Sequence, residues 1–193
     1  AMVHAHGDDE EPLSMHELQN LMHQLITGGY ETTQSAINHG MWALIRFPDI
    51  AEKIYEDESL LKPFIEEVLR WESPVQFLLR RTSKDVEVSG TVIPKDSMVM
   101  MGYGPANRDE EKFSCPHQFQ LNREGVGAHM AFGSGAHHCP GALLGRQEMI
   151  RSFKFLVQRM KNIKIDKPLQ EPVHNFSMFF MPMKEFFITF DKR

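Results

Sequence analysis

The run from Phe132 to Gly141, FGSGAHHCPG, holds the residues of this sequence that are best suited to chemistry. Its three glycines let the backbone fold closely around the side chain of Cys139, because a residue without a Cβ adopts conformations that others avoid. A helix is predicted directly after the run, and the free N–H groups and positive dipole end of a helix N-terminus stabilise a thiolate. With His137 and His138 beside it, Cys139 is expected to act as a nucleophile or as a metal ligand.

Four interpretations compete for this cysteine. A structural cysteine in a glycine-rich turn is the simplest of them. A hydrolase nucleophile elbow, Gly-x-Ser-x-Gly, fails because Phe132 stands where a glycine must precede Ser134 by two residues. Zinc is a rival, although the nearby cysteines and histidines lack the usual spacing of zinc ligands. The fourth is a haem held by one cysteine thiolate, with the apolar loop against one face of the macrocycle. The residues that make zinc a rival are Cys115, His117, His129, His137, His138 and Cys139.

The same run resembles the haem-binding signature of the cytochrome P450 family, Phe-Gly-x-Gly-x-His/Arg-x-Cys-x-Gly, at every fixed position. The resemblance implies that Cys139 is the proximal ligand of the iron of haem b. It also implies that His137 stands where a side chain meets a haem propionate. Cofactor contacts from Phe132, Gly133 and Gly141 are implied in the same way.

A second stretch, Glu67-Val68-Leu69-Arg70, is similar to the family's Glu-x-x-Arg motif. A Glu and an Arg at i and i+3 share a helix face and can pair, and such a pair taken alone would be a solvated surface pair. The resemblance implies a buried structural pair instead. Gln118, in PHQF, stands where the family usually has an arginine that completes a network with this pair. We therefore expect the network to be weaker or differently connected.

Arg80, in RRTSKDVEV, falls at the position of the family's propionate-binding arginine, five residues before Asp85. A guanidinium group suits that role because it donates two parallel hydrogen bonds to a carboxylate. Its neighbour Arg81 is not assigned the role. Further along, Asn107-Arg108-Asp109 opens a stretch that is similar to the meander before the haem loop of the family.

The sequence GGYETT, residues 28–33, is similar to the family's central-helix motif. By this resemblance Gly28 and Gly29 leave room for O₂ and open the helix groove, since they lack a Cβ. Glu31 and Thr32 are the implied catalytic pair that handles protons. The alternative is an exposed Glu and a Thr whose hydroxyl bonds back to its own helix.

These residues must be positioned by a mainly α fold with small β-sheets. Ser14 and Glu17 form a capping box, and apolar residues then recur at helical spacing up to Phe47-Pro48, which predicts a helix close to 50 Å long at about 1.5 Å per residue. The resemblance implies the C-terminal half of the cytochrome P450 fold, with that long central helix and a cysteine loop followed by a helix. We expect a solvated lead-in over residues 1–13 and a single haem-binding domain over 14–193 that is incomplete on its N-terminal side. The other predicted elements are helices over 49–57, 63–71 and 140–160, strands over 86–88, 92–93 and 98–101, an irregular loop over 102–138, and strands with a turn near Pro182 in the tail 163–190.

Composition excludes several other classes of protein. The 193 residues are 41% hydrophobic and 24% charged, which argues against disorder, and the formal charge of −5 argues against a nucleic-acid or anionic-membrane partner. No apolar run is long enough to span a bilayer, and the acidic start does not resemble a signal peptide. With only two cysteines, the sequence indicates a soluble, cytoplasmic protein of bacterial type.

The resemblance implies a haem-thiolate monooxygenase, which inserts one oxygen atom from O₂ into a hydrophobic small molecule. Its electrons would come from NAD(P)H through a ferredoxin and a ferredoxin reductase, or through a flavoprotein. Because the resemblance covers only the C-terminal half of such a protein, the alternative is a truncated haem-binding module, or one that associates with itself as a homo-oligomer, without oxygenase turnover. The expected substrate contacts are Gln76, Phe77, Leu78, Phe179 and Phe180.

Overall fold

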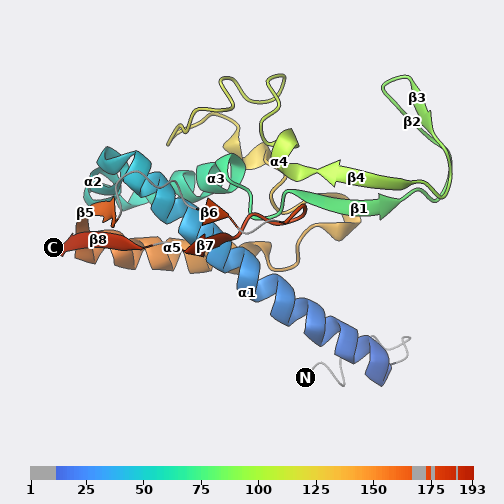
Figure 1. The fold of residues 1–193 in the computed structure, drawn as a ribbon, viewed down its shortest axis with the longest axis horizontal. Helices are drawn as coiled ribbons and strands as arrows, with labels where there is room; N and C mark the ends of the chain where they lie inside the picture. The colour runs from blue at the N-terminus through green and yellow to red at the C-terminus, as the bar shows by residue number, and fades with distance from the viewer. Residues whose placement is uncertain (1–11, 167–172, 175–176, 186) are drawn as a thin grey trace.

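The long helix α1, Met15–Arg46, dominates the computed structural model, which describes residues 12–166, 173–174, 177–185 and 187–193 (Figure 1). Its start is fixed by the predicted capping box, in which the Glu17 backbone N–H donates to Ser14 Oγ (3.3 Å) and the Ser14 N–H donates to Glu17 Oε2 (2.8 Å). The helix is 32 residues long and ends before Phe47-Pro48, as predicted. The expected lead-in lies almost entirely outside the described residues.

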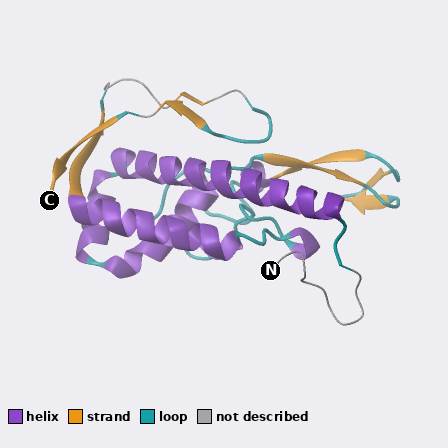
Figure 2. Ribbon diagram, turned by 90° about the horizontal axis from the view of Figure 1, so that it is seen from below, coloured by secondary structure: helices purple, strands orange, loops and turns teal. Residues whose placement is uncertain are grey.

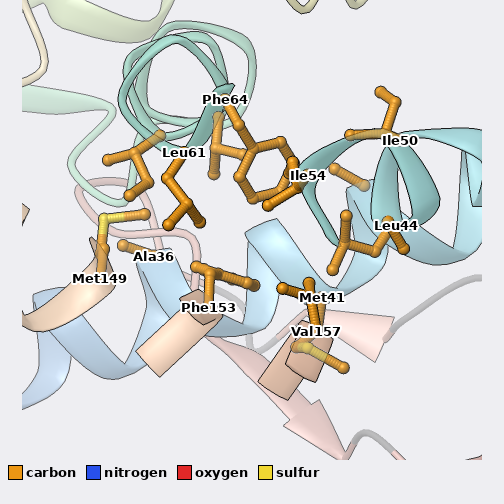
Figure 3. Packing of buried hydrophobic residues seen from close by; sticks show 14 of the residues in the cluster. Ala36, Met41, Leu44, Ile50, Ile54, Leu61, Phe64, Met149, Phe153 and Val157 are labelled. Carbon is orange, nitrogen blue, oxygen red and sulfur yellow. The ribbon is translucent and has the colours of Figure 1, made fainter. Parts of the chain in front are cut away.

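Three more helices pack around the C-terminal half of α1. They are α2 (Pro48–Glu56), α3 (Leu61–Trp71), which follows the short 3₁₀ helix η2 (Glu58–Leu60), and α5 (Ala142–Arg159). Figure 2 shows these helices gathered together with the strands around their margin. Their apolar faces meet in one core that includes Leu44, Phe64 and Phe153 (Figure 3). A Cβ on Gly40 would overlap the ring of Phe153, so this glycine sets how closely α1 and α5 approach.

The strands form small antiparallel pairs, which confirms the predicted mainly α fold with small sheets. Within the described residues β1 (Phe77–Arg81) pairs with β4 (Met98–Gly102), and β2 (Val86–Val88) pairs with β3 (Thr91–Ile93). Near the C-terminus β5 (Met160–Ile165) pairs with β8 (Ile188–Lys192), and β6 (Val173–His174) pairs with β7 (Met183–Glu185). Strand β1 was not predicted, because FLLRR does not alternate between apolar and polar residues.

The segment between β4 and α5 is mostly irregular, as its glycine content predicts. It begins with the short helix α4 (Tyr103–Ala106) and contains two 3₁₀ turns, η3 (Val126–Ala128) and η4 (Gly135–His137). We call residues 107–131 the meander segment and residues 132–141 the cysteine loop. Both depend on contacts with α3 and α4 for their path, since neither has a sheet of its own.

The N-terminal half of α1 presents apolar side chains to solvent. Met15, Met22, Leu25, Ile26 and Tyr30 are all exposed, with Tyr30 exposed to 72%. Figure 1 shows this half of the helix extending beyond the other helices. None of the helices in the described residues combines the length and the apolar character that crossing a membrane requires.

Candidate functional site

The cysteine loop holds Cys139 at the N-terminus of α5. Gly133 and Gly135 have φ values of +67° and +68°, in the left-handed region that residues with a Cβ avoid. The loop then closes on itself, because the Cys139 N–H donates to Phe132 O (2.9 Å) and the Ala142 N–H donates to Cys139 O (3.2 Å). Cys139 is half-buried and precedes Gly141, the N-cap residue of α5, by two residues, so it lies close to the positive end of the helix dipole.

The surroundings of this thiol suit a ligand that requires only one donor atom from the protein. Within the part of the chain that the structure describes, no group of three or more His, Cys, Asp or Glu side chains is arranged to hold a metal ion. His129, a candidate zinc ligand, instead donates from Nε2 to Glu66 Oε2 at 2.9 Å. A haem fits this arrangement, since the macrocycle supplies four ligands to its iron and the protein supplies the thiolate. Leu143 and Leu144, which follow the cysteine, are exposed to 73% and 63% and offer apolar surface beside it.

A buried ion cluster supports the cysteine loop from the side of α3. Arg146 Nε and Nη2 donate to Glu66 Oε1 (2.7 Å) and Oε2 (3.0 Å), and the Arg146 guanidinium lies 4.4 Å from the centre of the Phe132 ring. Burial acts to raise the pKa of Glu66, but the hydrogen bonds from His129 and Arg146 outweigh it and lower this pKa to about 2. Sequence reasoning missed this cluster, because neither Glu66 nor Arg146 belongs to a motif that was recognised.

The Glu67–Arg70 pair is buried and is part of a larger network. Both side chains have no exposed area, and Arg70 Nε and Nη2 donate to the two carboxylate oxygens of Glu67 at 2.7 and 2.8 Å. The surface pair considered from the sequence is therefore excluded. Arg123, from the meander segment, donates through Nε to both Glu67 oxygens at 3.1 Å. Both arginines also bind main-chain oxygens of the meander segment, including Gln118 O at 3.2 and 2.7 Å.

Of the two outcomes expected from Gln118, a weaker network or a differently connected one, the structure shows the second. Arg123 provides the second guanidinium, and Gln118 contributes its backbone carbonyl, so the identity of its side chain does not decide the connection. A signal was available in the sequence, because Arg123 is the one arginine between Arg108 and Arg146. Glu67, a buried carboxylate that is already paired with Arg70, gains a second cation in Arg123. Buried charges are usually paired with opposite charges in this way.

Arg80 reaches toward the cysteine loop through Tyr103. Its Nη2 donates to the Tyr103 hydroxyl (3.3 Å), and its Nη1 donates to Leu79 O (2.8 Å). A Cβ on Gly133 would lie 3.9 Å from that same hydroxyl, so the three residues share one neighbourhood. Arg81 is instead paired with Asp96 (3.3 Å) on the exposed side of the sheet. His137 is exposed at the end of η4.

The predicted proton-handling residues, Glu31 and Thr32, lie on α1 as an exposed Glu and a Thr whose hydroxyl bonds back to its own helix, which is the alternative considered from the sequence. Glu31 is exposed, and the half-buried Thr32 donates from Oγ1 to Gly28 O at 2.6 Å. The predicted opening of the helix groove is absent, since α1 continues as a regular α-helix through Gly28 and Gly29. A Cβ on Gly29 would meet nothing within 4 Å. Open space therefore exists beside this turn without a break in the helix.

The predicted substrate contacts come together from two distant stretches of chain. Gln76 N–H donates to Phe179 O (2.8 Å), Met181 N–H donates to Pro74 O (2.9 Å), and Phe180 is bridged to Val75. These bonds place Phe179 and Phe180 beside the start of β1, where Phe77 and Leu78 are half-buried. The Gln76 side chain is used by the fold, because its amide donates to Ser73 O (2.6 Å) and packs against Gly104.

Comparison with known proteins gives one consistent result. The model of the family described as cytochrome P450 matches residues 1–190. The curated relatives include cytochrome P450 CYP107DY1 from Priestia megaterium, 37% identical over 92% of this chain and 43% of the relative. Another is a methyl-branched lipid omega-hydroxylase from Mycobacterium bovis, 37% identical over 94% of this chain and 42% of the relative.

Solved structures agree with the sequence relatives. The chain resembles CYP109E1 from Bacillus megaterium, solved in complex with testosterone, with a TM-score of 0.89 and 32% identity over 97% of this chain and 51% of that one. The chain spans about two fifths of the length of the curated relatives that it matches.

Proposed function

The chain belongs to the cytochrome P450 family, and on that basis we propose that it forms the haem-binding half of a haem-thiolate monooxygenase. The observation that carries the proposal is the position of Cys139, half-buried at the N-terminus of α5 in a loop that two left-handed glycines shape. A helix N-terminus stabilises a thiolate, which is the form of cysteine that binds iron. When bound, the haem supplies the chemistry by which one atom of O₂ enters an organic substrate.

Several side chains are suited to hold the haem through its propionates and its faces. Arg80 is an exposed residue whose guanidinium donates to the Tyr103 hydroxyl and to Leu79 O, and His137 is an exposed residue within the cysteine loop. Phe132 offers a flat apolar surface that Arg146 holds in place from behind. Gly133 and Gly141 keep the loop free of side chains near the thiol, and a Cβ on Gly141 would lie 3.8 Å from Cys139 Sγ.

Glu31 and Thr32 are assigned to proton movement on the other side of the site. The Thr32 hydroxyl donates to Gly28 O in the described state, so it must exchange this bond before it donates a proton to a molecule in the pocket. Glu31 is exposed and adjoins Thr32 in the sequence, so it connects this turn of α1 with solvent, the source of the proton that Oγ1 passes on. Gly29 is exposed and a Cβ there would meet no atom within 4 Å, so this turn of α1 leaves room for a small molecule such as O₂.

The substrate is proposed to be a hydrophobic small molecule. Phe77, Leu78, Phe179 and Phe180 form an apolar group from two joined segments, and apolar surface favours an apolar ligand. The names of the relatives point the same way, because one is a lipid hydroxylase and another was solved with a steroid. The electrons are proposed to come from NAD(P)H through a ferredoxin and its reductase, or through a flavoprotein.

The test compares two cysteine variants of the full-length protein of which this chain is part. Cys139→Ser is expected to abolish the strongly red-shifted Soret band that a thiolate-bound haem gives after reduction and addition of CO. Cys115→Ser is the matched control and is expected to keep that band, because Cys115 is exposed in the meander segment. Identical spectra for the two variants would refute the assignment of Cys139.

A further inference from the structure

His39 is a buried histidine on α1 that contacts two other segments of the chain. Its side chain has no exposed area. Its Nδ1 lies 2.8 Å from Glu72 O, just after the C-terminal end of α3, and its Nε2 lies 2.9 Å from Met181 O. One imidazole therefore connects the central helix both to α3 and to the segment of residues 177–183, which we call the aromatic loop.

Both partners of His39 are hydrogen-bond acceptors, and this limits what the ring can do. A neutral imidazole carries one N–H, so it donates to only one of the two carbonyls at a time. Burial lowers the pKa of His39 to about 4, which keeps the ring neutral at pH 7 although both carbonyls act to raise the pKa. The tautomer thus decides whether His39 holds α3 or the aromatic loop.

The aromatic loop is already attached to the strand side of the fold. Met181 N–H donates to Pro74 O, and Phe179 O accepts from Gln76 N–H. These bonds fix the loop relative to the segment that follows α3, but they do not tie it to α1. The contact of His39 Nε2 with Met181 O supplies that tie in the tautomer that carries its proton on Nε2.

The position of His39 along α1 gives this tie a functional meaning. His39 follows Thr32 by seven residues, which is two turns of an α-helix, so the two side chains lie on the same face about 10 Å apart along the axis. A loop anchored at His39 is therefore anchored to the face of α1 that carries the Thr32 hydroxyl. Phe179 and Phe180 lie in that loop, one or two residues from the carbonyl that His39 binds.

We propose that His39 is a positioning residue for the substrate, which holds the aromatic loop at a fixed place relative to the Thr32 face of α1. The proposal rests on the proposed function, because the aromatic loop matters to substrate only if it lines the pocket. It predicts that loss of the His39 donor changes where a substrate is oxidised while the haem site stays intact.

The experiment uses the full-length, haem-loaded protein and three variants. His39→Leu removes the donor, and His39→Gln keeps an amide that can donate to one carbonyl. His23→Leu is the matched control, because His23 is an exposed histidine on the same helix. Hydrogen exchange of the backbone amides of residues 179–181 is measured together with the ratio of products from one apolar substrate.

His39→Leu is expected to speed the exchange of these amides about two- to tenfold, which corresponds to the loss of one ordinary hydrogen bond. The product ratio shifts in this variant, returns part of the way in His39→Gln, and stays unchanged in His23→Leu. The proposal is overturned if His39→Leu and His39→Gln exchange at the normal rate in the aromatic loop. Faster exchange throughout the chain with an unchanged product ratio also overturns it, since that result means a general structural role.

The test of the His39 role and the test of the proposed function can fail independently of each other. If the unmodified protein lacks a thiolate-type haem spectrum, the proposed function fails, but the exchange measurement still tests whether His39 holds the loop. If the spectrum is normal and the exchange is unaffected by His39→Leu, only the positioning role fails.

Discussion

At the scale of single residues, the network of Glu67, Arg70 and Arg123 illustrates what buried charge demands. Glu67 accepts from both guanidinium groups and from the backbone N–H of Gln120 (2.8 Å), so each of its two carboxylate oxygens has hydrogen-bond donors. Removing a partner from such a group leaves an uncompensated charge, whereas an exposed ion pair contributes little.

The first prediction compares a buried ion pair with an exposed one. Glu67→Ala is expected to lower the free energy of unfolding of the full-length protein by about 3–5 kcal/mol, because it leaves two guanidinium groups buried without their anion. Lys53→Ala is the control, since Lys53 pairs with Asp49 (2.6 Å) on the surface and is expected to contribute less than about 1 kcal/mol. Thermal and urea unfolding measure both, and equal effects would contradict the assignment of Glu67 to the core.

The second prediction concerns acid and again belongs to single side chains. The pKa of His39 is lowered from 6.5 to about 4 by burial, so the unfolded chain binds a proton that the folded chain refuses. Stability from this group is fully present above pH 6.5 and is lost as the pH falls to 4, by about 3 kcal/mol in total. His39→Gln should flatten the dependence of unfolding free energy on pH over this range. An unchanged slope in that variant would show that His39 does not titrate as a buried neutral group.

Glu66 contributes to the pH dependence of stability at a lower pH than His39. Its pKa is lowered in the folded state, so protonation of its carboxylate destabilises the fold. Because its folded pKa is about 2 and its ordinary pKa is 4.5, its stabilising effect is present above pH 4.5 and is lost between pH 4.5 and 2. The windows of His39 and Glu66 barely overlap, so pH 5 to 6 reports on His39 alone among these two groups.

At the scale of elements, the sequence predicted the parts of the fold that depend on local chemistry. The capping box of Ser14 and the helical spacing of apolar residues located α1 to within a residue, and Pro140 marked the approach of α5. Strand β1 was missed because its pairing with β4 depends on a distant segment and not on an alternating pattern. Arg123 was missed for a related reason, since its carboxylate partner lies 56 residues away.

The third prediction tests the contact between two helices. Gly40→Ala is expected to destabilise the protein by about 1–3 kcal/mol, because its Cβ would overlap the ring of Phe153 on α5 and force the helices apart. Gly29→Ala on the same helix is the control, since a Cβ there meets no atom within 4 Å in the described residues. Alanine also favours the helix by about 1 kcal/mol over glycine, so this control should keep or raise the melting temperature. A harmless Gly40→Ala would mean that α1 and α5 pack less closely than described.

At the scale of the whole molecule, the exposed N-terminal half of α1 is the feature that governs association of the chain. Met15, Met22, Leu25 and Ile26 form an apolar stretch that soluble proteins normally cover. The curated relatives are more than twice as long as this chain, which leaves ample sequence to cover it in the full-length protein. We expect an isolated chain of 193 residues to cover the same surface by contact with another copy.

The fourth prediction follows from that exposed surface. In sedimentation experiments the isolated 193-residue chain is expected to associate, whereas the full-length protein stays monomeric at the same concentration. Met22→Lys with Ile26→Lys should reduce association of the isolated chain, because charge makes the helix face soluble without touching the core. An isolated chain that sediments as a single monomer and also oxidises a substrate would contradict the need for the missing half.

The meander segment has a consequence of another kind. It is held mainly through its own carbonyl oxygens, with Asn107 O and Pro116 O bound by Arg70 and Ser114 O and Cys115 O bound by Arg123. Every residue type has such an oxygen, so the exposed side chains of this segment can vary while its path is kept, whereas buried ones such as Arg123 and Asn107 cannot. The outer surface that these exposed side chains form can therefore change its charge and polarity while the segment keeps its course beside the cysteine loop.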